Sequence, residues 1–192
     1  DEREMGKKVA RMHRHLAGDG LYGWDRDNTI GATPQSNEKQ KCWVDFFREQ
    51  RLRFQLQRAE ENGLVCPGAE KLLDGIGKFF EKHHPEASLL HGDLWGGNSG
   101  FLKTGEPVLY DPACYYGDRE TDLAFTEMFG GFGASFYAGY AEVWALDPGY
   151  ASRRDLYNLY HVLNHYNLFR GSYGGQAQRM VQDLVTGKGF SS

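Results

Sequence analysis

Apolar residues along most of this chain recur at intervals of three and four positions, which is the spacing of one face of an α-helix. The most regular example comprises Leu156, Leu159, Tyr160, Leu163 and Tyr166, and it predicts a helix over residues 152–169. The same spacing predicts further helices over residues 5–16, 43–61, 67–83, 121–128, 136–144 and 180–185. The predicted structure is therefore mainly helical, and the last residues, 186–192, are expected to fray.

Short apolar runs interrupt the helical pattern near the middle of the chain. Residues 89–90 and 99–102 flank a polar loop, and a turn at residues 104–106 leads into a third run at residues 108–110. These runs predict short strands that form a small β-hairpin. The expected fold class is therefore α+β, mainly helical, with residues 1–192 forming a single domain.

The polar loop carries the residue types that phosphoryl transfer requires. Asp93 is followed five positions later by Asn98, and Asp111 comes directly after the third apolar run. A kinase needs one carboxylate that accepts the proton of the attacking hydroxyl, and an amide oxygen and a second carboxylate that hold Mg²⁺ against the phosphates of ATP. Protein kinases space their aspartate, asparagine and second aspartate in this way. The sequence therefore predicts a catalytic loop at residues 89–98, with Asp93 as base, and a metal loop at residues 108–113, with Asn98 and Asp111 as magnesium ligands.

Each of these residues also has a structural interpretation. Aspartate and asparagine are common in turns and caps, which could account for Asp93, Asn98 and Asp111. His91 is expected to brace the loop, because Asp93 already fills the role of base. Trp95 could form a wall of the substrate site or anchor the loop.

Longer blocks around these residues resemble the fructosamine (ketosamine) kinase family, which belongs to the kinase-like superfamily that includes aminoglycoside phosphotransferases. The blocks are residues 91–98, 111–113, 115–124, 30–37 and 46–52. They follow one another in the same order as in the family, over about residues 5–185. The resemblance is specific for that reason, since a loose match to His-Gly-Asp would not bring the other blocks with it.

The resemblance implies a protein-kinase-like C-terminal lobe, with the hairpin carrying the catalytic and metal loops. In such enzymes an N-terminal lobe carries the glycine-rich loop over the phosphates, a phosphate-binding lysine and the glutamate partner of that lysine. None of these is present here, so the N-terminal lobe is expected to lie upstream of Asp1 and to be absent from the sequence given. This chain alone is then expected to be inactive.

The implied activity is ATP-dependent phosphorylation of a sugar hydroxyl of ketosamines. The substrate would be a small glycated amine or a glycated lysine of a protein, and ATP and Mg²⁺ would be required. The resemblance also implies that Gln35 and Asn37 lie beside the sugar-binding cleft, where their amides could bind substrate hydroxyls. It further implies that Asp122 holds the backbone of the catalytic loop in place. Two other functions stay open: a kinase for an aminoglycoside, choline or another alcohol, and a non-catalytic binding module with a kinase-like fold.

Two motifs elsewhere suggest other chemistry and do not fit it. Residues 18–23 spell G-x-G-x-x-G, the pattern of a phosphate-binding glycine loop. They follow a predicted helix instead of a strand, and they lead into aspartates that would repel phosphate. His161 and His165 have the i, i+4 spacing of a zinc pair, but Val162 stands where a zinc protease has its glutamate. His83 and His84, at the end of a predicted helix, are expected to interact with its carbonyl groups.

Composition argues against nucleic-acid and membrane partners and indicates the state of the cysteines. Charged residues make up 25% and apolar residues 40% of the chain, and the net charge is −4, so a nucleic-acid partner is not expected. No apolar run approaches the ~20 residues of a membrane span. Cys42, Cys66 and Cys114 lie far apart, which is typical of reduced thiols in the cytoplasm.

Overall fold

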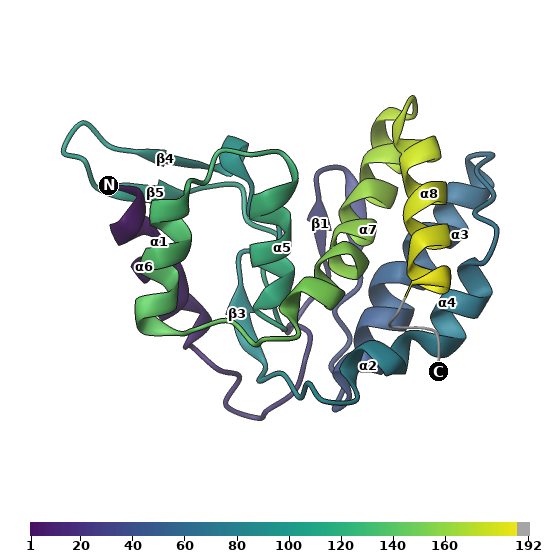
Figure 1. Ribbon diagram of the computed structural model, residues 1–192, viewed down its shortest axis with the longest axis horizontal. Coiled ribbons are helices and arrows are strands. Elements are labelled where there is room, and N and C mark those ends of the chain that lie inside the picture. Colours follow the sequence, from purple (N-terminus) through teal and green to yellow (C-terminus); the bar gives the residue numbers. More distant parts are fainter. Residues whose placement is uncertain (188–192) are drawn as a thin grey trace.

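The structure is a computed structural model that describes residues 1–187, and the expectation for residues 188–192 lies outside this range. It is mainly helical, as the sequence predicts (Figure 1). The α-helices are α1 (Glu2–His13), α2 (Trp43–Phe47), α3 (Phe54–Glu61), α4 (Ala69–Gly75), α5 (Glu120–Met128), α6 (Ala134–Val143), α7 (Tyr150–Phe169) and α8 (Tyr173–Thr186). No helix in this range is both long enough and apolar enough to cross a membrane.

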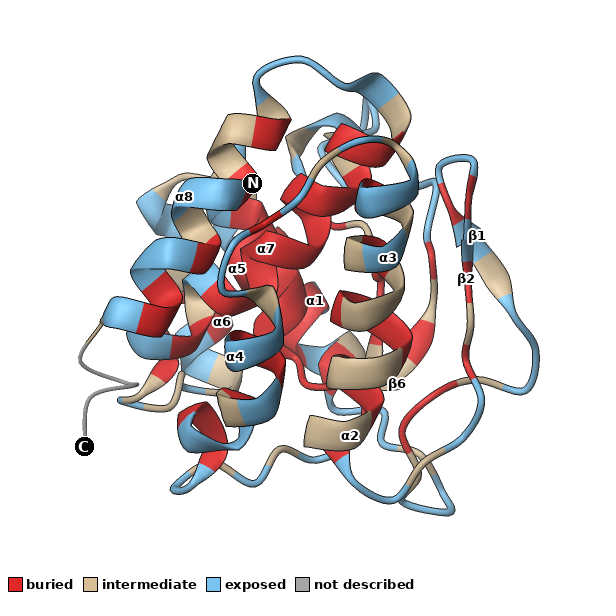
Figure 2. Cartoon of the chain, turned by 90° about the vertical axis from the view of Figure 1, so that its right-hand side faces the viewer, coloured by how far each residue is buried: buried red, intermediate tan, exposed pale blue. Residues whose placement is uncertain are grey.

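Helix α7 is the centre of the molecule. Its apolar residues recur around most of its circumference, and it packs against α3, α5 and α8. In Figure 2 the buried residues of α5 and α7 lie side by side in the interior, while α4 and α8 expose one face to solvent. A helix that is buried on nearly all sides holds its neighbours in fixed positions, and α7 therefore sets the place of α5, which begins directly behind the catalytic loop.

The two long helices predicted near the N-terminal half are each divided in the structure. Between α2 and α3 the chain forms a π-helical segment, Arg48–Arg53, and α4 continues as a 3-10 helix, Ile76–Phe80. A π-helical segment inserts a residue into the helical repeat and turns the following side chains. Arg51 is thereby buried in the protein interior.

The strands within residues 1–187 form three antiparallel pairs. They are β1 (Asn28–Ile30) with β2 (Thr33–Gln35), β3 (Ser88–Leu90) with β6 (Tyr115–Gly117), and β4 (Ser99–Phe101) with β5 (Pro107–Leu109). The predicted hairpin is β4–β5. The strand predicted at residues 89–90 is β3. Strands β1, β2 and β6 were not predicted, because three residues without a distinct apolar run are too short to show an alternating pattern.

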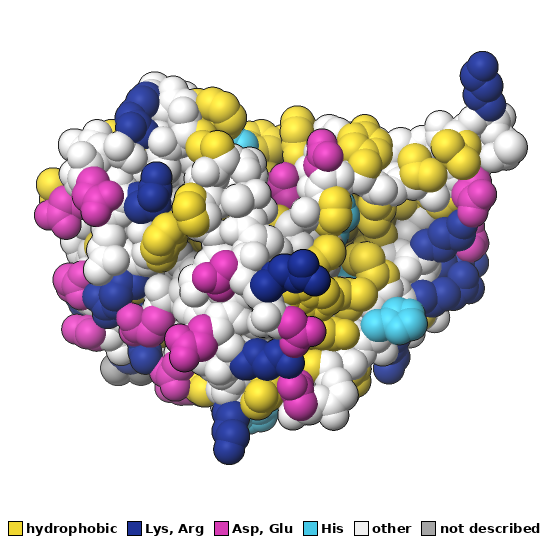
Figure 3. Space-filling view, turned by 180° about the vertical axis from the view of Figure 1, so that it is seen from behind, with side chains coloured by type: hydrophobic (Ala, Val, Ile, Leu, Met, Phe, Trp, Pro, Cys, Tyr) yellow, Lys and Arg dark blue, Asp and Glu magenta, His cyan; other side chains and the backbone are white. Residues whose placement is uncertain are grey.

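The N-terminal helix lies on the other side of the molecule from α8, beside α6 and the β4–β5 hairpin (Figure 1). Helices α1 and α6 approach closely because glycines occupy the contact: a Cβ atom at Gly6 would lie 2.0 Å from the Phe136 carbonyl oxygen. From behind, hydrophobic side chains gather in a hollow between two flanks that carry most of the charged side chains (Figure 3).

Candidate active site

The catalytic loop follows β3 and returns through a 3-10 turn, Gly96–Asn98, into β4. This turn brings Asn98 back against Asp93. The amide nitrogen of Asn98 donates hydrogen bonds to the Asp93 carbonyl oxygen (3.0 Å) and to Asp93 Oδ2 (2.9 Å). Both bonds use the nitrogen, so Asn98 Oδ1 and Asp93 Oδ1 are the atoms left to contact a ligand.

A buried carboxylate beneath the loop holds its backbone. Asp122, in the first turn of α5, accepts the N–H groups of His91 (2.7 Å) and Gly92 (2.9 Å), and His13 Nε2 lies 3.1 Å from it. Burial alone would raise the pKa of the Asp122 carboxyl, but the hydrogen bond and charge of His13 and the His91 N–H hold it below its ordinary value. Asp122 is therefore an anion that fixes two consecutive residues before Asp93.

The metal loop lies against the catalytic loop. The N–H of Ala113 donates to the His91 carbonyl oxygen (2.8 Å). Gly92 has a φ of +81°, and a Cβ atom there would lie 2.0 Å from the Ala113 carbonyl oxygen, so only glycine permits this approach. Asp111 itself has a φ of +52°, in the left-handed region that aspartate tolerates better than most residues.

His91 joins the two loops through its ring. Its Nε2 lies 3.0 Å from the Tyr110 carbonyl oxygen, which can only accept a hydrogen bond, so Nε2 carries the proton. Its Nδ1 then accepts the N–H of Asp93 (3.3 Å). Both ring nitrogens are occupied by the backbone, and the side chain is buried. These contacts are those of a bracing residue and not of an acid or base.

The structure brings Asp93, Asn98 and Asp111 to the wall of one cavity of about 370 Å³. Burial raises the pKa of Asp93 to about 6, and the charges of Asp122 and Asp111 act in the same direction, against the lowering effect of Asn98. Carboxylate and amide oxygens are the hard ligands that Mg²⁺ prefers, and a divalent cation would relieve the repulsion between the two carboxylates. The donor set therefore fits a magnesium ion.

A second cavity of about 370 Å³ adjoins the first and shares Gly31, Asp93 and Trp95 with it. Its walls are largely aromatic and apolar: Ile30, Trp95, Phe129, Leu168, Phe169 and Tyr173, with Asn164 and His165. Asp93 is the only acidic residue among the described residues that line it. Asp93 thus lies between a polar cavity, which Asn98 and Asp111 also line, and an apolar one.

Trp95 lines both cavities. Its ring packs over Gly97, where a Cβ atom would lie 2.2 Å from ring carbons, and meets Phe129 edge to face at 6.0 Å. The side chain is still 37% exposed, so it can contact a ligand while its position is held by the loop.

Gln35 and Asn37 do not reach either cavity. Both are 1% exposed, and protein groups already bind both ends of each carboxamide. The expectation that these amides contact a substrate is therefore corrected: they lie beside the site and are used within the protein. Thr29 and Gly31 of the same hairpin region line the cavity instead.

His161 and His165 do not form a metal site. His161 is buried with its ring stacked on Phe125 at 3.6 Å, and burial lowers its pKa to about 3. His165 Nδ1 bonds to the His161 carbonyl oxygen (2.7 Å). His83 does not bind helix carbonyls as expected, but bonds to Asp118 (2.7 Å).

His83, Glu120 and Asp147 form the one three-residue cluster within residues 1–187 that could hold a metal by proximity. Arg153 already bonds both oxygens of Glu120 (2.7 and 2.9 Å) and one oxygen of Asp147 (2.8 Å). The carboxylates are therefore neutralised by a buried guanidinium, and the cluster is an ion-pair network. The sequence gives no local sign of this network, because Arg153 lies 33 positions after Glu120.

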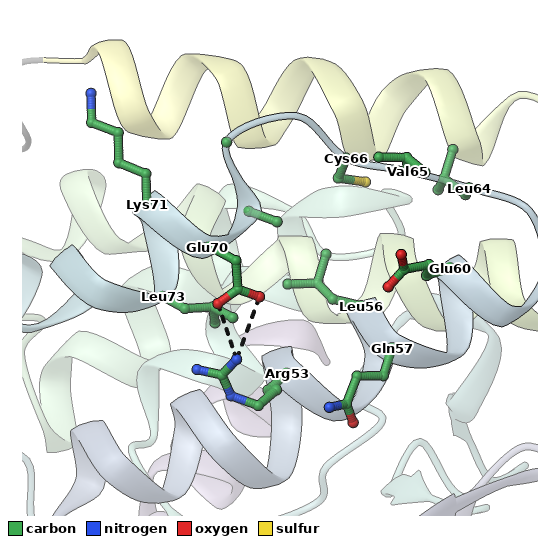
Figure 4. A pocket seen from close by; sticks show the side chains of 12 residues that line it. Arg53, Leu56, Gln57, Glu60, Leu64, Val65, Cys66, Glu70, Lys71 and Leu73 are labelled. Atoms are coloured by element: carbon green, nitrogen blue, oxygen red, sulfur yellow. Dashed lines mark hydrogen bonds and ion pairs between the residues drawn. The ribbon is translucent and has the colours of Figure 1, made fainter.

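A further pocket, of about 280 Å³, lies between α3 and α4, where Arg53 and Glu70 form an ion pair at 3.2 Å (Figure 4). Cys66 lies at its wall, and burial raises the pKa of this thiol, so it is not an activated nucleophile. The pocket shares no residue with the cavities at Asp93. All three cysteines are free thiols.

An aspartate followed by an asparagine in a loop before a hairpin, and a second aspartate after the hairpin, is the arrangement of a kinase-type catalytic segment. The model of the family described as "Fructosamine kinase" matches residues 1–187. The chain belongs to the fructosamine kinase family.

Individual relatives agree with this assignment. The chain is 49% identical over 181 residues to "Probable ketoamine kinase" of Synechocystis and 43% identical over 189 residues to "Protein-ribulosamine 3-kinase, chloroplastic" of Oryza sativa. A crystal structure assigned as a fructosamine-3-kinase from Haemophilus somnus superimposes on 96% of the chain with a TM-score of 0.89 and 33% identity. The chain spans 61%, 55% and 63% of the lengths of these three proteins.

Proposed function

We propose that the chain is the catalytic part of an ATP-dependent ketosamine kinase, with Asp93 as the base. The observation that carries this proposal is the convergence of Asp93, Asn98 and Asp111 on one cavity. Family membership supports the same chemistry. A binding module would have no chemical need for two carboxylates and an amide oxygen around one space.

Asp93 Oδ1 would accept the proton of the acceptor hydroxyl. Asn98 holds the other carboxylate oxygen, so the free oxygen has a fixed direction. Proton transfer to a positioned base contributes roughly 10²–10⁴ in rate. The carboxylate is ionised above its pKa of about 6, which makes it a competent base at neutral pH.

Asn98 Oδ1 and the Asp111 carboxylate would hold the magnesium ion. Bound Mg²⁺ supplies positive charge against the phosphates of ATP and keeps them in line with the acceptor. The residues of this chain orient that charge through backbone contacts: Asp122 fixes the catalytic loop, and His91 and Ala113 fix the metal loop against it.

The apolar cavity beside Asp93 would receive the acceptor. Trp95 and Phe129 line it with aromatic rings, which suit the apolar face of a sugar and the carbon skeleton of an amine. An aminoglycoside carries several positive charges, and the described residues of this cavity offer only one carboxylate to them. The proposed substrates are therefore a small glycated amine or a glycated lysine of a protein.

The lobe organisation is part of the proposal. Residues 1–192 would form one C-terminal lobe, and the segments that bind the outer phosphates would come from an upstream lobe of a longer protein, without which this chain would be inactive. The free thiols suit a reducing compartment, and we propose the cytoplasm as the location.

The test uses the longest natural protein that carries this chain. ADP formation is measured with fructosyl-lysine, ATP and Mg²⁺ for the wild type, Asp93→Asn and Asp45→Asn. Asp45 is a matched control, because it is a half-exposed aspartate whose ion pair with Arg48 lies away from the site. Asp93→Asn is expected to lower kcat by at least ~100-fold and Asp45→Asn to leave it unchanged. Equal turnover by Asp93→Asn would remove Asp93 from the mechanism.

A further inference from the structure

The metal loop is held by two side-chain amides, those of Gln35, which is buried, and Asn28, which is partly buried. After Asp111 the chain turns through Pro112, and the carbonyl oxygens of the next two residues each accept a hydrogen bond from one of these amides. Gln35 Nε2 donates to the Ala113 carbonyl oxygen (3.1 Å), and Asn28 Nδ2 donates to the Cys114 carbonyl oxygen (2.8 Å). Gln35 also donates to Asn28 Oδ1 (2.8 Å), so the two amides act as a pair.

The pair is fixed in turn by helix α7. The hydroxyl of Tyr160, which is 3% exposed, donates to Gln35 Oε1 (2.7 Å). This bond determines which end of the Gln35 carboxamide faces the metal loop, since the oxygen is directed to Tyr160 and the nitrogen to Ala113. A chain of hydrogen bonds therefore runs from the central helix, through β2, to the backbone two residues beyond Asp111.

A second series of hydrogen bonds holds the amide of Asn28. Asn37 Nδ2 donates to Asn28 Oδ1 (2.9 Å), and Asn37 Oδ1 accepts from Arg51 Nη2 (2.7 Å). Arg51 is buried in the π-helical segment and its guanidinium lies 4.1 Å from the centre of the Tyr115 ring. Buried amides with partners at both ends are rigid, because leaving any of them unpaired in the interior is costly.

Asp111 needs this support. Its side chain is exposed and its backbone has a φ of +52°, so its direction is set by the residues on either side. Before it, the Tyr110 carbonyl oxygen is held by His91 Nε2. After it, Ala113 is held twice, by the His91 carbonyl through its N–H and by Gln35 through its carbonyl.

We propose that Gln35, oriented by Tyr160, is a positioning residue for the metal loop, and that it sets cation affinity at Asp111 without contacting substrate. This inference rests on the proposed function of Asp111 as a metal ligand. Loss of a group that orients a metal ligand typically weakens metal affinity by about 10–100-fold.

The experiment measures Mn²⁺ affinity, by electron paramagnetic resonance of the free ion, in the longest natural protein with ADP present. Gln35→Met keeps the volume of the side chain and removes its hydrogen bonds, and it is expected to weaken Mn²⁺ binding by at least ~10-fold. Tyr160→Phe removes only the orienting hydroxyl and is expected to weaken binding by a smaller factor in the same direction. Tyr166→Phe is the matched control, because this tyrosine of the same helix bonds to the Asn62 carbonyl oxygen, away from the site.

Two further readouts separate positioning from a general loss of structure. Hydrogen exchange at the Ala113 amide should quicken in Gln35→Met and Tyr160→Phe, while the melting temperature of Tyr160→Phe matches that of Tyr166→Phe. The KM for fructosyl-lysine should stay constant in both variants.

The inference is overturned if Tyr160→Phe and any folded Gln35→Met bind Mn²⁺ as the wild type does, or if only the KM for fructosyl-lysine rises. If Gln35→Met does not fold, Tyr160→Phe decides alone. Asp111→Asn separates a failure of the proposed metal site from a failure of the positioning role of Gln35. If Asp111→Asn loses Mn²⁺ binding while the other two variants keep it, only the positioning role fails. If Asp111→Asn keeps it, the proposed metal site fails and the inference with it.

Discussion

A single methyl group at Gly92 should separate the two loops of the candidate active site. Gly92 has a φ of +81°, and an added Cβ atom would lie 2.0 Å from the Ala113 carbonyl oxygen and 2.7 Å from its carbon. Real Cβ atoms do not approach this closely, so the backbone must move. The Ala113 N–H bond to the His91 carbonyl (2.8 Å) lies at the same contact and would lengthen.

The magnitude follows from these contacts. A left-handed alanine costs about 1–2 kcal/mol relative to glycine, and loss of one buried hydrogen bond costs about 1 kcal/mol. Gly92→Ala should therefore lower the free energy of unfolding by about 2–3 kcal/mol. Gly105→Ala is a matched control, because its φ is +82° and nothing lies within 4 Å of the added atom. It should show the backbone cost alone, about 1–2 kcal/mol.

The assay compares urea unfolding of the two variants with their Mn²⁺ affinity and turnover. Because a displacement of about 1 Å in a catalytic group can cost ~100-fold in rate, Gly92→Ala should lose turnover and weaken Mn²⁺ binding, whereas Gly105→Ala should change neither. Equal effects of the two substitutions on stability and on Mn²⁺ binding would refute the claim that the approach of the loops at Gly92 forms the site.

Two further predictions concern the charged network behind the site. Glu120→Gln leaves the buried guanidinium of Arg153 without its main partner and should lower the free energy of unfolding by about 3–5 kcal/mol. Asp45→Asn at the surface should change it by less than ~1 kcal/mol. Similar values for the two variants would contradict the claim that burial makes the Glu120–Arg153 pair costly to break. Burial lowers the pKa of His83, but its bond to Asp118 outweighs this and holds the pKa above the ordinary 6.5. The stabilisation by His83 is then present below pH 6.5 and lost as pH rises through the raised value, so the stability difference between wild type and His83→Gln should shrink from pH 6 to pH 9. A difference that grew with pH would be inconsistent with this sign, and exposed His84→Gln is the control.

The candidate site could be predicted from the sequence, because its residues lie close together along the chain. Asp93 and Asn98 lie in one loop, and Asp111 follows after a single hairpin, so their spacing alone predicted one site. The long helix α7 was accessible for a similar reason, because twenty residues of regular spacing leave little ambiguity.

The hydrogen-bond network that supports the metal loop could not be predicted from the sequence, because its members are far apart in the chain. Gln35 and Tyr160 are separated by 125 positions, and a polar residue in a three-residue strand carries no sign of burial. Both amides of the β2 region were therefore assigned to substrate contact, although their partners are protein groups. The ion pair between Glu120 and Arg153 could not be predicted for the same reason, because its guanidinium lies on α7.

The most direct test of the central claim is a crystal structure of the longest natural protein with Mg²⁺ and a non-hydrolysable ATP analogue. We expect a metal ion about 2.0–2.1 Å from Asn98 Oδ1 and from an Asp111 carboxylate oxygen, with Asp93 Oδ1 facing the apolar cavity. A nucleotide whose metal is bound by other residues, for example at His83 and Asp147, would contradict it.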